Sequence, residues 1–204
     1  MLHLQTILPD TLELLKTFSA RPEMEGLRLV GGTALALHYG HRQSVDLDFF
    51  GKLSVSQDEI LDMVSKIGDY VVNNHNASIL QMTVNGIKVD IVDYSRYDWI
   101  APPVIEEGIV LASPPDIAAM KVNAIEGRGS RKDFVDIYVL LQKYSIKEIL
   151  SFYSQKYPNY SIFRALLSLA YFDDAEGQAM PRMFIPDTWE EMRAYITKIV
   201  KTCQ

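Results

Sequence analysis

Cysteine is almost absent from the chain. Its 204 residues include a single cysteine, Cys203, next to the last residue, and one thiol cannot form an internal disulfide. Since such chains are typical of a reducing compartment, we expect a cytoplasmic protein. Apolar runs are short as well, and none approaches the roughly 20 residues that a membrane-spanning helix needs. The N-terminus also lacks the basic start and apolar stretch of a signal peptide, so no membrane association is expected.

The chain also lacks an excess of positive charge. Its 20 lysines and arginines stand against 26 aspartates and glutamates, which gives a formal net charge of -6. Broad binding to nucleic acid depends on positive charge, so this balance argues against a protein that coats DNA or RNA. It leaves room for a local basic channel. The acidic excess also suits a site that gathers carboxylates around a metal ion.

What the sequence does contain is a change of pattern near residue 113. Before it, apolar alternation predicts strands at 27–30, 45–50, 78–84, 87–94 and 108–112, and helical periodicity predicts helices at 10–20, 33–39 and 56–67. After it, helices are predicted at 115–126, 132–143, 146–155, 160–172 and 187–201. The expected fold class is therefore α/β (α+β): a core with a mixed sheet over residues 1–112, followed by a helical C-terminal region over residues 113–204.

Two carboxylates lie one residue apart in the predicted strand 45–50, at Asp46 and Asp48. Successive side chains of a strand point to opposite faces, so these two share a face. Neighbouring carboxylates repel each other, and each favours its protonated form. A divalent cation removes that conflict, and Mg²⁺ is typically held by one or two carboxylates together with substrate phosphate oxygens. The pattern predicts a Mg²⁺ or Mn²⁺ site.

A glycine pair, Gly31 and Gly32, precedes this strand and is followed by Thr33 at the start of a predicted helix. Free backbone N–H groups at a helix start suit phosphate, and glycine lets the chain approach it closely. We expect all three residues to bind the phosphates of a nucleotide. Arg42 either contacts phosphate as well or anchors the loop before the strand.

A third carboxylate, Asp90, lies in the middle of the second strand of a hairpin whose turn is predicted at Asn85-Gly86. A buried strand rarely tolerates an unpaired carboxylate. We expect Asp90 to complete the metal site and to act as base on the attacking hydroxyl. The alternative is an exposed residue on a hairpin with one solvated face. Asp93 points to the opposite face and cannot join Asp90 without a bulge.

A basic segment follows in the predicted helices 115–126 and 132–143. Lys121 and Arg128 fall on one helical face, and triphosphate chemistry needs cations near the transferring group. Lys121 follows an apolar turn, which indicates that it is partly buried and aimed at phosphate. The alternative for these cations is a solvated face or mutual ion pairing. For Arg131 and Lys132 we favour that alternative, or binding of a substrate strand.

Taken in order, these motifs resemble the AbiEii/AbiGii-type nucleotidyltransferase family. This family is the toxin half of certain bacterial toxin–antitoxin and phage-abortive systems and belongs to the polymerase-beta-like nucleotidyltransferase superfamily. The resemblance rests on residues 31–36 and 42–50 and on the block from Lys121 to Asp136, and it covers about residues 27–140.

The resemblance implies a minimal polymerase-beta-like fold in which Asp46 and Asp48 hold metal and Lys121 and Asp136 are active-site residues. Asp136 would orient Lys121 or touch the nucleotide. The chain departs from the pattern in three ways. Thr33 stands where the superfamily usually has serine, a mild change that keeps a hydroxyl, and Lys132 stands where many family members have arginine. The chain is also shorter than many members, which puts an accessory substrate-binding region in doubt.

The expected activity is transfer of a nucleoside monophosphate from an NTP to a hydroxyl acceptor, with release of pyrophosphate. The resemblance favours a macromolecular acceptor, an RNA such as tRNA or a protein, and implies a cognate antitoxin as partner. Two alternatives stay open. One is a small-molecule nucleotidyltransferase of the antibiotic-resistance kind; the other is a nucleotide-binding module without turnover, against which the intact carboxylate pair argues.

Overall fold

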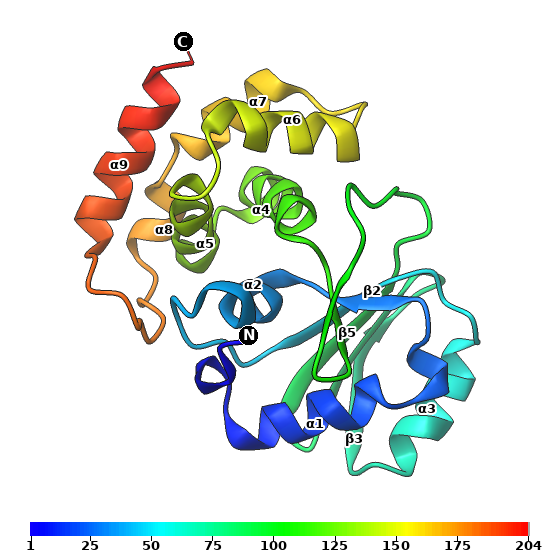
Figure 1. Cartoon of the computed structure of the whole chain (residues 1–204). Helices are drawn as coiled ribbons and strands as arrows, with labels where there is room; N and C mark the ends of the chain where they lie inside the picture. The colour runs from blue at the N-terminus through cyan, green and yellow to red at the C-terminus, as the bar shows by residue number, and fades with distance from the viewer. Residues whose placement is uncertain (204) are drawn as a thin grey trace.

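A computed structural model describes residues 1–203; Gln204, the last residue of the predicted helical region, lies outside the described residues. The chain forms a mixed sheet flanked by helices (Figure 1). The strands are β1 (Leu27–Leu29), β2 (Leu47–Gly51), β3 (Tyr70–His75), β4 (Ile79–Val84), β5 (Ile87–Asp93), β6 (Val104–Glu106) and β7 (Ile109–Leu111). The α-helices are α1 (Pro9–Ser19), α2 (Gly31–Tyr39), α3 (Gln57–Ser65), α4 (Pro114–Arg128), α5 (Arg131–Leu141), α6 (Ile146–Lys156), α7 (Ile162–Leu169), α8 (Asp173–Glu176) and α9 (Trp189–Lys201).

The sheet has the strand order β3-β4-β5-β2-β1-β7-β6. At its centre β2 runs parallel to β5 and antiparallel to β1, which confirms the predicted mixed sheet. Side chains of β2 alternate between the two faces. Phe49 stacks on Phe18 of α1 with ring centroids 5.8 Å apart, whereas Asp48 and Phe50 point to the opposite face, toward α4.

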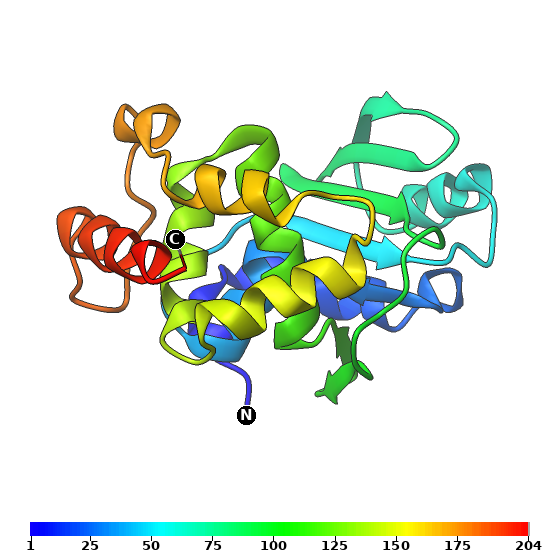
Figure 2. The ribbon, with the colours of Figure 1, turned by 90° about the horizontal axis from the view of Figure 1, so that it is seen from above.

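Helices cover both faces of the sheet. Figure 1 shows α1 and α3 on one side, and α2 with α4 to α9 on the other; Figure 2, seen from above, shows α6 and α7 lying over α4 and α9 at the outside. One hydrophobic core includes Leu29 of β1 and Ile117 of α4, so it runs through both predicted regions. Their division into two domains stays a prediction. In residues 1–203 no helix combines the length and apolar content that crossing a bilayer requires.

All the predicted strands and helices are present, with ends that differ by a few residues. The predicted hairpin turn is confirmed: Asn85 and Gly86 have φ of 49° and 81°, the left-handed values of a type I′ turn. The structure adds edge strands β3 and β6. Because most side chains of β3 are exposed, its sequence lacks the alternation of a half-buried strand, and sequence patterns did not reveal it.

One boundary was wrong in a way that matters for the site. The predicted strand 45–50 begins at Leu47, so Asp46 lies just before β2 rather than in it. The reason is a competing hydrogen bond: the Thr33 hydroxyl of α2 donates to the backbone carbonyl of Asp46. That bond draws the Asp46 backbone toward the helix, and pairing with β1 ends at Leu29.

Candidate active site

Two carboxylates face each other across the centre of the sheet. Asp48 of β2 and Asp90 of β5 are direct partners in the parallel pair, and both line a cavity of about 340 Å³ between the sheet and α4. Burial, together with the negative charges of Asp90 and Asp46, raises the pKa of the Asp48 carboxyl to about 6. The site therefore favours a proton or a cation at this position.

The two oxygens of Asp90 have different surroundings. Oδ2 accepts a hydrogen bond from Gln81 Nε2 at 2.9 Å and lies 3.2 Å from Lys88 Nζ. Oδ1 is buried and has no hydrogen-bond partner within the described part of the chain. Since an unpartnered buried carboxylate oxygen is costly, this orphaned oxygen fits a site built to receive a cation or a donor from a ligand.

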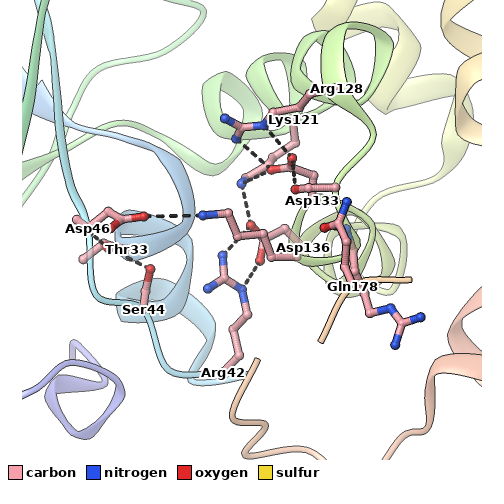
Figure 3. A network of polar contacts seen from close by, with 12 residues as sticks. Thr33, Arg42, Ser44, Asp46, Lys121, Arg128, Asp133, Asp136 and Gln178 are labelled. Carbon is pink, nitrogen blue, oxygen red and sulfur yellow. Dashed lines mark hydrogen bonds and ion pairs between the residues drawn. The ribbon is translucent and has the colours of Figure 1, made fainter. Parts of the chain in front are cut away.

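Asp46 is placed differently from the other two carboxylates. It lies outside the lining of the cavity, and its Oδ2 is 3.4 Å from Lys132 Nζ of α5 (Figure 3). Within residues 1–203 no three His, Cys, Asp or Glu side chains converge closely enough to form a preassembled metal cluster. The structure thus brings together the pair Asp48 and Asp90; the metal-binding roles of all three carboxylates stay predictions.

The glycine pair packs against charged side chains of the protein itself. Gly31 has a left-handed φ of 68°, and a Cβ atom there would collide with Asp48 Oδ2. A Cβ at Gly32 would collide with the Arg42 guanidinium. Glycine therefore allows the carboxylate to approach the start of α2. Among residues 1–203 no side chain caps that helix start, so its first N–H groups stay open for an anion, and Gly31 lines the cavity.

A second carboxylate cluster is centred on Asp133 and Asp136, which are both buried (Figure 3). Asp136 accepts hydrogen bonds from Arg42 Nε at 2.7 Å and Arg42 Nη2 at 2.8 Å, and its Oδ2 lies 2.6 Å from Lys121 Nζ. Its Oδ1 is also 2.8 Å from His41 Nε2. Burial alone would raise the pKa of Asp136, but Arg42 and Lys121 outweigh it and hold that pKa well below its usual range.

Asp133 completes this cluster. Lys121 Nζ lies 2.9 Å from its Oδ1, and Arg128 Nε lies 2.9 Å from its Oδ2. Burial again opposes ionisation, yet Lys121 and Arg128 hold the pKa of Asp133 below its usual range. Lys121 Nζ thus lies between the carboxylates of Asp133 and Asp136. Burial alone would lower the pKa of its ammonium, but the two negative charges outweigh burial and raise that pKa.

Several predicted site residues therefore have partners inside the protein. The Thr33 hydroxyl is buried and lies 2.9 Å from Ser44 Oγ, in addition to its bond to the Asp46 carbonyl. Arg42 is buried on Asp136, which favours the loop-anchoring alternative for it. Asp136 is enclosed and contacts Lys121, which favours orientation of Lys121 over contact with a nucleotide.

The predicted site residues divide into two groups by position. Those that line the cavity are Gly31, Asp48, Asp90, Lys121 and Arg128. Those that lie outside its lining are Gly32, Thr33, Arg42, Asp46 and Asp136. Direct contact of the second group with a nucleotide stays a prediction.

Sequence reasoning missed the side chains that hold Asp90. A signal for Gln81 was present: a two-residue turn at Asn85-Gly86 fixes the hairpin register and places Gln81 opposite Asp90, as observed. The alternation of side chains along β5 also places Lys88 on the same face as Asp90, because the two residues are two positions apart. His41 on Asp136 had no such signal, because 95 residues separate them.

Comparisons with known proteins identify the family of the chain. The sequence profile of the family described as nucleotidyl transferase AbiEii toxin, Type IV TA system, matches residues 13–199. An uncharacterized protein of Aquifex aeolicus, aq_aa25, is 34% identical over 184 residues, which cover 85% of each chain.

Solved structures share the fold at low sequence identity. JHP933 from Helicobacter pylori superposes with a TM-score of 0.56 at 17% identity, covering 98% of this chain and 90% of its own. MenT4, a nucleotidyltransferase toxin from Mycobacterium tuberculosis, gives a TM-score of 0.52 at 14% identity, covering 94% and 81%. The family profile spans most of the chain and confirms the resemblance drawn from the motifs: this protein is a nucleotidyltransferase and belongs to the AbiEii toxin family.

Proposed function

We propose that this chain transfers a nucleoside monophosphate from an NTP to a hydroxyl group of a macromolecule, with Mg²⁺ or Mn²⁺ as the cofactor. The observation that carries the proposal is the pairing of Asp48, which lies against Gly31 at the open start of α2, with Asp90, whose Oδ1 is buried and unpartnered among residues 1–203. Carboxylate oxygens next to free N–H groups suit a metal nucleotide, since the metal takes the former and phosphate the latter.

Asp48 and Asp90 would hold the metal, and Asp46 would join them when Lys132 releases its carboxylate. The chemistry that the metal supplies is neutralisation of phosphate charge and a lowered pKa of the attacking hydroxyl. Gly31 and the first turn of α2 hold the phosphates. Lys121 contributes positive charge close to Asp48, and its position is fixed by Asp133 and Asp136.

In the transfer step the acceptor oxygen forms a bond to the α-phosphorus of the NTP. The bond between that phosphorus and the bridging oxygen to the β-phosphorus breaks, and pyrophosphate leaves with the bonding electron pair. The Asp90 carboxylate receives the proton of the acceptor hydroxyl, while Gln81 and Lys88 hold it in place.

The acceptor is an RNA such as tRNA or a protein, and the enzyme acts as a toxin that a cognate antitoxin restrains. This part of the proposal is supported by the family, whose description names a toxin of a toxin–antitoxin system. A cytoplasmic location fits the free thiol of Cys203.

The test is incubation of the purified protein with each α-³²P-labelled NTP, Mg²⁺, and either total RNA or a protein lysate. We expect label in one macromolecular fraction. Asp90→Asn keeps the shape of the side chain but removes its charge, and should lower labelling by about 100-fold or more. Asp93→Asn is the matched control, because Asp93 lies on the same strand and faces the other way; its labelling should stay at the wild-type level.

Absence of labelled product from the wild-type protein with all four NTPs would contradict the proposal. Equal labelling by Asp90→Asn and wild type would contradict the role of the carboxylate pair. Label found only in an added small molecule would assign the enzyme to the antibiotic-resistance kind instead.

A further inference from the structure

The cavity has two chemically different ends. One end carries Asp48, Asp90 and Gly31, which the proposed function uses for metal and phosphate. Phe50 follows Asp48 on the same face of β2, two residues and about 7 Å further along the strand. Away from Gly31 the lining is apolar: Phe50 packs on Tyr94, which contacts Tyr157, and Ile117 and Met120 of α4 also line the cavity.

The apolar end presents mainly ring surface. The hydroxyls of Tyr94 and Tyr157 lie 2.5 Å apart, and one donates a hydrogen bond to the other. Phe50 packs on Tyr94 with ring centroids 5.3 Å apart, and Phe50 and Met120 are only partly buried. The partly exposed ring of Phe50 suits the face of a nucleobase, because every base has a π-face that stacks on such rings.

One uncharged polar group enters this cavity without a partner. Asn123 of α4 is partly buried and lines the cavity, and its amide makes no hydrogen bond to any residue from 1 to 203. The neighbouring charged residues of the lining, Lys121 and Arg128, are both paired with Asp133. The Asn123 amide offers two donors and an acceptor side by side, which is the arrangement that reads the edge of a base.

We propose that the apolar end holds the nucleobase of the NTP and that Asn123 selects which base is used. This inference rests on the proposed function, since it places the phosphates at Gly31 and Asp48. The ribose then spans the short distance along β2 from Asp48 to Phe50. Phe50 and Met120 bind any base by its face, whereas Asn123 bonds only the base whose edge matches its amide.

The wrong base is disfavoured because, once it covers the partly buried Asn123, the amide loses its water without gaining matching hydrogen bonds. One amide making two bonds to a base edge discriminates by about 10- to 100-fold. The four NTPs should therefore differ in affinity by about that factor, and the difference should depend on Asn123 rather than on Phe50.

The experiment measures binding without turnover. Dissociation constants are determined by calorimetry for the four α,β-methylene nucleoside triphosphates with Mg²⁺ and without any acceptor. Wild type should bind one base at least about 10-fold more tightly than the others. In Asn123→Ala the four constants should fall within about threefold of one another, while Phe50→Ala should weaken all four by a similar factor of about 10.

Asn159→Ala is the control, since Asn159 is exposed and lies outside the cavity lining; its binding profile should match that of wild type. Circular dichroism of each variant checks that a change of profile does not come from unfolding. Equal binding of all four analogues by wild type, or an unchanged ranking in Asn123→Ala, would overturn the inference. A base preference that appears only after acceptor is added would also overturn it, because the apolar end would then hold the acceptor.

The failure of this inference can be told from the failure of the proposed function. If wild type transfers no label, the proposed function fails whatever the analogues do. If wild type transfers label and Asn123→Ala uses the four NTPs in the wild-type ratio, only the assignment of the base site fails.

Discussion

The molecule contains two pairs of aspartates in opposite electrostatic surroundings: one pair is buried and ion-paired, and the other is partly buried and lines the cavity. Asp133 and Asp136 are enclosed, ion-paired with Lys121 and bonded to arginine, so their pKa values are lowered. Asp48 faces Asp90 across the sheet, and burial with these like charges raises its pKa to about 6. Ionised aspartate thus stabilises the fold at Asp133 and Asp136, whereas at Asp48 the ionised form is unfavourable.

This difference separates a pair that holds the structure together from a pair that belongs to the candidate active site. The Asp136 cluster joins the loop before β2, through Arg42, to α4 and α5, and so fixes the helices over the sheet (Figure 3). The Asp48–Asp90 pair lines the cavity, and Asp90 Oδ1 has no hydrogen-bond partner among residues 1–203. Perturbed groups of the second kind, in a cavity, are typical of functional sites. The following experiments test this difference between the two aspartate pairs.

The largest effect on stability is expected from Asp136→Asn. The substitution leaves the buried Arg42 guanidinium without its only carboxylate partner in residues 1–203, and breaking a buried ion pair from one side costs about 3–5 kcal/mol of unfolding free energy. Urea unfolding of the variant and of Asp174→Asn, an exposed control, measures it. A loss below about 1 kcal/mol would show that the Asp136 cluster does not hold the helices on the sheet.

A smaller loss of stability is expected from placing alanine at Gly31, the first residue of α2. Gly31→Ala and Gly108→Ala both place a side chain at a left-handed φ, which costs about 1–2 kcal/mol in each. Only at Gly31 does the new Cβ also collide with Asp48, whereas Gly108 has open space. The two variants should lose comparable stability, but only Gly31→Ala should lose nucleotidyl transfer. Equal transfer activities would show that the position of Asp48 is unimportant.

The acid limb of the stability curve should report on the Asp136 cluster. Because the folded pKa values of Asp133 and Asp136 lie below the unfolded value of about 3.9, the unfolded chain binds more protons in that range. Their contribution is present above about pH 4 and is lost as the pH falls further. Unfolding free energies measured from pH 7 to pH 2.5 should therefore fall less steeply in Asp136→Asn than in wild type; parallel curves would contradict this.

The smallest effect is expected from Lys132→Ala. The pair with Asp46 is 3.4 Å long and both side chains are partly exposed, so its loss should change stability by less than about 1 kcal/mol. It should free the Asp46 carboxylate and strengthen Mn²⁺ binding, measured by electron paramagnetic resonance. Weaker Mn²⁺ binding would show that Asp46 takes no part in holding metal.

Local pattern was enough for the centre of the fold, and non-local contacts account for what it missed. Alternation along β2 and β5 brings Asp48 and Asp90 to one face, and the Asn85-Gly86 turn sets the hairpin register. No local pattern pairs Arg42 with Asp136, which lie 94 residues apart. Likewise, strand propensity extends to Asp46, but a hydrogen bond from Thr33 removes that residue from the strand.

The central claim is that Asp48 and Asp90 form a site for a cation at the expense of the metal-free fold. The most direct measurement is the melting temperature of Asp48→Asn at pH 7, with and without Mg²⁺. Since the raised pKa makes the ionised Asp48 unfavourable in the folded state, the neutral amide should melt about 2–4 °C higher than wild type in the absence of metal. Mg²⁺ should stabilise wild type and leave the variant unchanged. A lower melting temperature of the metal-free variant, together with undiminished stabilisation by Mg²⁺, would contradict the account.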